Sequence, residues 1–171
     1  ACRIDASLPP RSVVLESVFV LECVAHEALN AERFLPPTPV SIAVDTKLQP
    51  RPDFAPHERA GLRAGDRAFD LSPMRKVLLA LVPPMLDKAR EEGAARCAEL
   101  ANEAMARADA LLGTEIQRLE ALARVNPAVR ADEIDALRRE REQLLAALPT
   151  ARPRLDALRL VTSADFLTLR R

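Results

Sequence analysis

The sequence predicts an α+β fold, a small, mostly antiparallel β-sheet with a long antiparallel helical hairpin inserted before its last strand. Three observations lead to this prediction. Eleven of the fourteen prolines lie at or before Pro84, which favours strands and loops first and helices later. Two early segments alternate with period two. A later segment of about 40 residues repeats apolar side chains every three or four positions, as amphipathic helices do.

Residues 12–49 are expected to contain the first strands. Residues 12–25 place apolar side chains on one face and the acids Glu16 and Glu22 among valines on the other, which predicts a long strand covered on both faces to different degrees. Residues 40–44 alternate more cleanly and predict a half-buried strand.

Between these strands lies a stiff apolar connector. Proline fixes φ and disfavours helical geometry in the residue before it, so the segment is expected to be extended from Leu35 onward. Such a connector either packs under the sheet or offers a preformed surface to a partner. Its residues are Phe34, Leu35, Pro36, Pro37 and Pro39.

The middle of the chain, residues 50–71, is polar and loop-rich. A helical region, residues 72–148, is expected to follow, with Ser72 as the N-cap and Pro73 at the first helical position. Pro83 and Pro84 are expected to end this first helix or to kink it into the next one.

Residues 85–148 predict the helical hairpin. A first helix over 85–124 is followed by a break at 125–127 and by a second helix from Ala131, so the two helices must be antiparallel. Gly93 and Gly113 should weaken the first helix locally. The expected buried stripe of that helix comprises Cys97, Ala101, Ala104, Ala108, Leu111, Leu112, Ile116, Leu119 and Leu122.

In the second helix the apolar residues repeat in sevens, with Arg141 in an intervening seam position; they are Ile134, Leu137, Leu144 and Leu148. Residues 154–162 then predict a strand that returns to the sheet. The whole chain, residues 1–171, is interpreted as a single domain of a larger protein, because it starts at Ala1 rather than Met.

Composition excludes several classes of function. The formal charge is zero, so no global attraction to nucleic acid or to an anionic membrane is expected. Three cysteines without a C-x-x-C pair argue against a disulfide framework or a structural zinc site. The apolar runs are too short to span a bilayer, and no signal peptide is present, so a cytoplasmic protein is expected.

No catalytic or cofactor site is predicted. Cys23 and His26 lie three residues apart, but a buried structural cysteine explains Cys23 better than a thiolate–imidazole pair. His57 lies in a polar loop without further ligands at metal-binding spacing. Glycine-rich nucleotide motifs are missing, so this piece is not expected to hydrolyse ATP or to bind a cofactor.

A basic cluster near the end of the hairpin is the main candidate surface. Arg138, Arg139 and Arg141 lie beside Glu140 and Glu142, and the simpler interpretation is a solvated helix face with pairs such as Arg138 with Glu142. The functional interpretation is a contact patch, with the connector's Arg33, for an acidic protein or nucleic acid. Stacking aromatics are missing, which does not support single-strand binding.

Several segments carry a family resemblance. Residues 17–22, 30–40, 118–127 and 154–161, in this order, are similar to the C-terminal domain of the RapA family of bacterial RNA polymerase-associated ATPases of Swi/Snf type. The most specific runs are Arg-Phe-Leu-Pro-Pro-Thr-Pro and Arg-Leu-Asp-Ala-Leu-Arg-Leu. The resemblance runs from about residue 13 to residue 162, and it is weakest across residues 50–110.

This resemblance implies a parent protein that recycles RNA polymerase with ATP-driven, helicase-like lobes absent from this chain. The chain itself would be a non-catalytic domain that contacts core RNA polymerase or those lobes, in the bacterial cytoplasm and without a membrane. Two alternatives remain open. One is a domain that only regulates the parent ATPase within its own chain, and the other is a free-standing dimerisation hairpin.

Overall fold

The computed structural model of the chain describes residues 2–4, 8–52, 54, 63–64, 74–163 and 165–166. The chain forms two compact units. The sheet unit contains Ala1–Val20, Pro39–Ala94 and Leu155–Arg171, and the hairpin unit contains Leu21–Thr38 and Ala95–Arg154. The expected helix start at Ser72 and Pro73, and most of the expected loop 50–71, lie outside the described residues.

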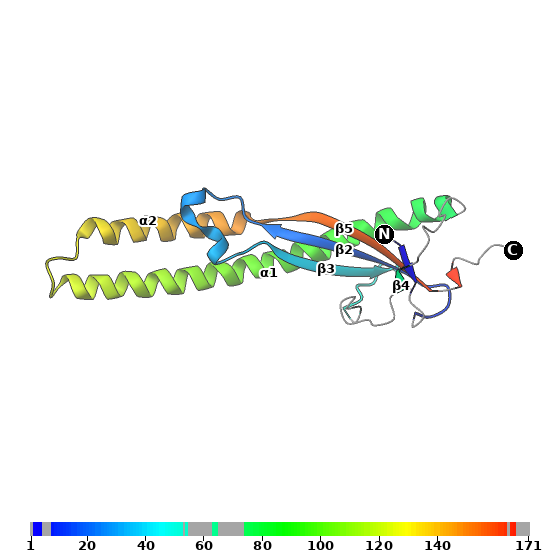
Figure 1. Ribbon diagram of the computed structural model, residues 1–171, viewed down its shortest axis with the longest axis horizontal. Helices are drawn as coiled ribbons and strands as arrows, with labels where there is room; N and C mark the ends of the chain where they lie inside the picture. The colour runs from blue at the N-terminus through cyan, green and yellow to red at the C-terminus, as the bar shows by residue number, and fades with distance from the viewer. Residues whose placement is uncertain are drawn as a thin grey trace. The chain divides into compact units, whose positions relative to one another are not determined.

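The predicted α+β class is confirmed. The strands of the described residues are β1 (Cys2–Ile4), β2 (Val13–Glu22), β3 (Thr38–Asp45), β4 (Arg63–Ala64) and β5 (Arg152–Thr162). They form one sheet in the order β3-β2-β5-β1-β4, so the returning strand joins the sheet as expected. Figure 1 shows β2 running opposite to both β3 and β5. β1 was not anticipated, and it pairs in parallel with β5 and antiparallel with β4.

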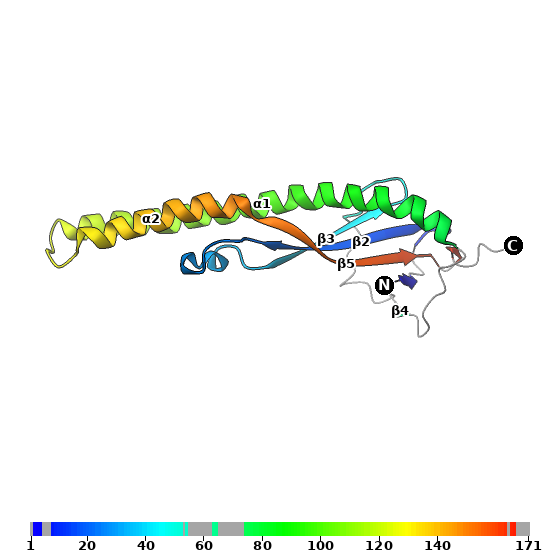
Figure 2. The same ribbon diagram turned by 90° about the horizontal axis from the view of Figure 1, so that it is seen from above.

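Both faces of β2 are covered, in agreement with its mixed apolar pattern. Val13, Leu15 and Phe19 pack against Met85 and Ala89 of helix α1. Figure 2 shows the first part of α1 lying along this face of the sheet. On the opposite face a smaller cluster forms, and its members are Leu8, Val14, Ala43, Phe54 and Val161.

A polar group is buried in the opposite face of the sheet. The carboxylate of Glu16 is only 1% exposed and accepts hydrogen bonds from Arg159 at 2.7 Å and from the Ser41 hydroxyl at 3.0 Å. These three residues come from β2, β5 and β3. The buried carboxylate therefore joins three adjacent strands, at a place where an unpaired carboxylate would oppose folding.

The outer edge of strand β3 is closed to pairing with a further strand near both of its ends. Asp45 donates its backbone N–H to the carbonyl of Gln49, and the Ala43 carbonyl accepts from the N–H of Arg51. Backbone groups of alternate residues point to the same side of a strand, so Ser41 and Pro39 also face this edge. Because proline lacks an N–H, Pro39 cannot donate there.

Helix α1 (Arg75–Ala123) is one continuous helix of 49 residues. Of the two alternatives expected at Pro83 and Pro84, the one in which they end a helix is wrong, since both lie inside α1. The burial of Met85 and Ala89, each 0% exposed, holds the following turn against the sheet and outweighs the local preference of proline. Neither helix of the described chain combines the length and apolarity needed to cross a bilayer.

The hairpin unit contains the second part of α1 and helix α2 (Ala131–Ala147), which run antiparallel (Figure 1). The predicted break is confirmed, and the Asn126 side chain accepts the backbone N–H of Ala128 in that turn. Ile134, Leu144 and Leu148 are buried along the seam, as their spacing predicts, whereas Leu137 is only partly buried.

Candidate protein-interaction surface

The connector packs onto the hairpin through its apolar residues. Phe34 and Leu35 are 7% and 4% exposed and follow the short helix η2 (Ala31–Arg33). Arg107 of α1 donates to the carbonyl oxygen of Phe34 at 3.0 Å. The remaining prolines differ: Pro36 and Pro37 are exposed, and Pro39 is exposed within β3.

Arg33 is held by two contacts at the end of η2. Its guanidinium donates to the Glu140 carboxylate of α2 at 3.0 Å. It also lies 4.5 Å from the centre of the Phe34 ring, within the range of a cation–π contact. Arg33 therefore links the connector to α2 and is only partly available to a partner.

The three candidate arginines of α2 have different surroundings. Arg138 donates to Glu120 of α1 and to Asp135 rather than to the expected Glu142. Arg141 donates through Nε to Asp109 of α1 at 2.7 Å, so the seam arginine is paired across the hairpin.

Arg139 differs from both of these arginines. It is exposed and has no ion pair among the residues that the structure describes. Of the three, Arg139 is the one whose charge is free for a partner. A substitution at this position would also break no known contact within the hairpin.

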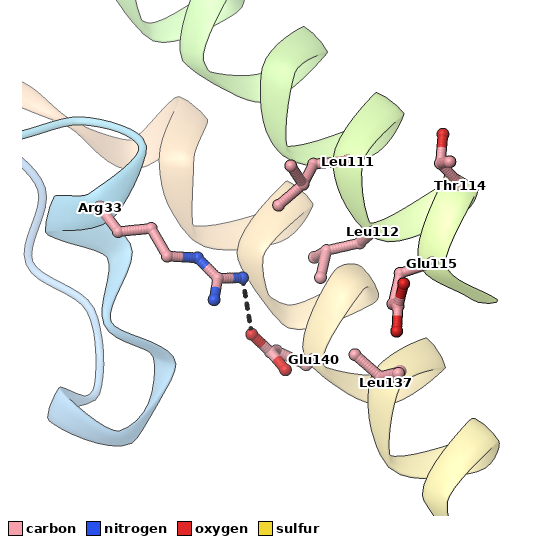
Figure 3. Close-up of a pocket in the computed structure, with 7 residues that line it drawn as sticks. All are labelled: Arg33, Leu111, Leu112, Thr114, Glu115, Leu137 and Glu140. Atoms are coloured by element: carbon pink, nitrogen blue, oxygen red, sulfur yellow. Dashed lines mark hydrogen bonds and ion pairs between the residues drawn. The ribbon is translucent and has the colours of Figure 1, made fainter. Parts of the chain in front are cut away.

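A pocket of about 500 Å³ opens beside these pairs in the hairpin unit (Figure 3). Its apolar lining comes from both helices: Leu112 of α1 and Leu137 of α2 point toward each other, and Leu111 lies at the mouth with 58% of its surface exposed. The complete lining is Arg33, Leu111, Leu112, Thr114, Glu115, Leu137 and Glu140.

The charged groups at the pocket are already paired within the chain. Glu140 accepts from Arg33, and Glu115 accepts two hydrogen bonds from Arg118. The Arg118 guanidinium holds the pKa of the Glu115 carboxyl below its usual value, so Glu115 is ionised at neutral pH. Because these charges are paired, the rim around the exposed Leu111 suits an apolar side chain of another protein rather than a charged small molecule.

Cys23 and His26, which were weighed as a thiolate–imidazole pair, each form a hydrogen bond with the backbone. The Cys23 thiol donates to the Ala147 carbonyl, and burial raises its pKa, so it is not a thiolate at neutral pH. His26 uses Nδ1 to accept the N–H of Ala28. His57 lies outside the described residues. Within the described ranges, no three His, Cys, Asp or Glu side chains gather as metal ligands do.

The pocket was not predicted, because its two leucines of α1 were assigned to the buried stripe. Leu111 and Leu122 are 58% and 36% exposed, so that stripe is narrower than expected. The adjacent pair Leu111 and Leu112 was the available signal. Neighbouring residues are about 100° apart on a helix, so both cannot occupy the centre of one seam.

The comparisons with known proteins agree with one another. The model of the RNA polymerase recycling family C-terminal domain matches residues 1–163. RNA polymerase-associated protein RapA of Pectobacterium carotovorum subsp. carotovorum (strain PC1) is 40% identical over 160 residues, which is 92% of this chain and 16% of that protein. The RapA of Actinobacillus pleuropneumoniae serotype 3 (strain JL03) is 34% identical over 163 residues, 94% of this chain and 17% of that protein. The chain thus spans about a sixth of the curated relatives it matches.

Proposed function

The chain belongs to the RNA polymerase recycling C-terminal family, and from that premise we propose that it is a non-catalytic contact domain of a larger ATPase. Its partner is bacterial core RNA polymerase, in the cytoplasm. The relatives are named for association with RNA polymerase, which supports this choice of partner. The observation that carries the proposal is the open, leucine-lined pocket whose rim charges are already paired.

The pocket offers apolar surface that a partner side chain can bury, and the ion-paired residues at its rim hold its shape. Fully burying a leucine side chain stabilises a complex by about 1.5–3 kcal/mol. Since Leu111 is 58% exposed, covering it would contribute about 1–2 kcal/mol, which is roughly a tenfold change in affinity. The Arg33–Glu140 pair fixes one wall of the pocket and needs no rearrangement to receive an apolar group.

The test is a titration of this chain with purified core RNA polymerase at two salt concentrations. The variant Leu111→Glu should weaken binding at least about tenfold, because it places a charge in an apolar contact. Val125→Glu is the matched control, because Val125 is 80% exposed in the hairpin turn and lies outside the pocket. Equal affinities of the two variants would contradict the assignment of the pocket.

The arginine contribution is measured in the same assay. Arg139→Glu should lower affinity and reduce its salt dependence, since surface charges are screened by salt. Arg138→Glu is a poorer probe, because it also removes the hydrogen bond to Glu120. If Arg139→Glu binds as the unaltered chain does, this charge plays no part in the contact.

Absence of binding at tens of micromolar polymerase would contradict the contact role and favour the intramolecular alternative. In that case the pocket would receive a segment of the parent chain, most of whose length lies outside these 171 residues when compared with the relatives. Leu111→Glu in the full-length parent would then alter ATP turnover without altering polymerase binding.

A further inference from the structure

The connector exposes two prolines and buries the two residues before them. Phe34 and Leu35 pack onto the hairpin and are 7% and 4% exposed, whereas Pro36 and Pro37 are both exposed. Arg107 of α1 holds the start of this segment by donating to the carbonyl oxygen of Phe34. The two apolar residues therefore anchor the connector, and the two pyrrolidine rings that follow them are presented to solvent.

The sequence restrains the backbone of these prolines more strongly than that of an ordinary loop. Each proline fixes its own φ and keeps the residue before it extended, and Leu35, Pro36 and Thr38 all precede a proline. Pro36 and Pro37 lie between η2 and β3, outside both elements. The Thr38 hydroxyl donates to the carbonyl oxygen of Pro36 at 2.7 Å and braces the segment further. These restraints favour polyproline II geometry, which needs no backbone hydrogen bonds of its own.

The exposed rings have a recognisable chemistry that the pocket does not use. Arg33 lines the pocket, but neither Pro36 nor Pro37 does. The run Pro36-Pro37-Thr38-Pro39 has the spacing P-x-x-P. Segments with this spacing and polyproline II geometry are bound by grooves lined with aromatic side chains, against which the rings pack.

Charge cannot be the main source of recognition at this segment. Arg33 donates to Glu140, so its charge is offset within the chain, and the exposed Glu32 precedes it. Arg107, which holds the Phe34 carbonyl, lies 3.9 Å from the carboxylate of Glu103. Charges of both signs thus border the prolines, and a partner must recognise the rings themselves.

We propose that Pro36 and Pro37, the proline ridge, are a docking site for a protein domain whose groove is lined by tryptophan and tyrosine side chains. A preformed polyproline II segment loses little conformational freedom on binding, so a short ridge can be recognised. A second copy of the chain cannot supply the groove, because the sequence contains neither tryptophan nor tyrosine. This docking site is additional to the polymerase contact proposed above and does not rest on it.

The absence of tryptophan from the chain gives a selective assay. The probes are two purified domains with proline-binding grooves, one of the SH3 type and one of the WW type, each first shown to bind a proline-rich peptide. The groove tryptophan of the probe is then the only source of indole fluorescence in the mixture. The intact chain, titrated into the millimolar range, should change the emission of at least one probe in a saturable manner. The affinity should depend little on salt, because the charges beside the ridge are of both signs.

The decisive variant is Pro36→Ala combined with Pro37→Ala. It removes both rings and should weaken binding at least about tenfold. The thermal midpoint should fall only slightly, because exposed prolines stabilise mainly by restricting the unfolded chain. Pro37→Glu changes a single exposed position and should also abolish binding. Pro127→Ala, at an exposed proline of the hairpin turn, is the matched control and should leave the affinity unchanged.

Three results would overturn the proposal. They are the absence of a saturable change with both probes, equal affinities of the unaltered chain and a folded ridge variant, and a steep fall in affinity with salt. The assay contains no polymerase, and the substituted prolines do not line the pocket. Its failure therefore leaves the proposed contact function standing, and failure of that function leaves this result standing.

Discussion

Two glycines in α1 provide a matched test of how closely this helix packs on the sheet. A Cβ atom added at Gly93 would lie 3.0 Å from two ring carbons of Phe19, whereas one added at Gly113 would meet no atom within 4 Å. Both glycines lie inside the same helix, so Gly→Ala removes the same backbone flexibility at each. The two substitutions differ in the contact with Phe19.

The magnitudes follow from these distances. Gly→Ala in a helix interior stabilises by about 0.5–1 kcal/mol, which is the full effect expected for Gly113→Ala. Gly93→Ala has the same gain but must displace a ring that is 2% exposed, and overpacking a core costs about 1–3 kcal/mol. Gly93→Ala should therefore be neutral to destabilising by about 2 kcal/mol. In a protein of this size the two thermal midpoints should differ by about 2–12 °C.

The assay is thermal and urea unfolding of both variants under identical conditions. Equal stabilisation by Gly93→Ala and Gly113→Ala would refute the close approach of α1 to Phe19. The double variant Gly93→Ala with Phe19→Leu provides an internal check. If the clash is the cause, the smaller side chain should relieve part of the cost, and the two changes should be non-additive.

Three further variants test the hairpin and the segment after β5. Leu144→Ala should lower the free energy of unfolding by about 2–5 kcal/mol, because Leu144 is 0% exposed. Leu111→Ala, at the exposed pocket mouth, should change this free energy by less than about 1 kcal/mol. Urea unfolding of the two variants measures the difference. Asp165 accepts hydrogen bonds from the Ser163 side chain and the Arg11 N–H, which lower its pKa. Its stabilisation is therefore present above the unfolded pKa and lost as pH falls through the lower folded pKa, so the difference in thermal midpoint between the unaltered chain and Asp165→Asn should shrink below about pH 4.

The sequence predicted the helices and strands that have a hydrophobic periodicity of their own. β2, β3 and the hairpin follow patterns of two and of three to four residues that persist over many positions. β1 has only three residues and carries no such pattern, and it exists because it pairs with β5 far along the chain. At Pro83 and Pro84 the local rule failed because burial of the neighbouring side chains outweighs it.

The charged residues of the candidate surface could be predicted from the sequence, but their ion-pair partners could not. Arg33 and Glu140 are 107 residues apart, and Arg141 and Asp109 are 32 apart, so neither pair has a local sequence signal. The arginines were recognisable as charged, yet only tertiary structure distinguishes the paired Arg141 from the exposed Arg139. The pocket arises in the same way, from leucines of two helices that a turn brings together.

The closed edge of β3 has a consequence for how this protein behaves at high concentration. A strand from a neighbouring molecule can extend a sheet only where successive outward N–H and C=O groups are vacant. Along this edge Pro39 offers no N–H, and the segment after Asp45 already bonds to Ala43 and Asp45. Ser41 alone retains both groups, too few to seed a growing stack of strands. We therefore expect this edge to resist amyloid-like assembly without any help from net charge, which is zero in this chain.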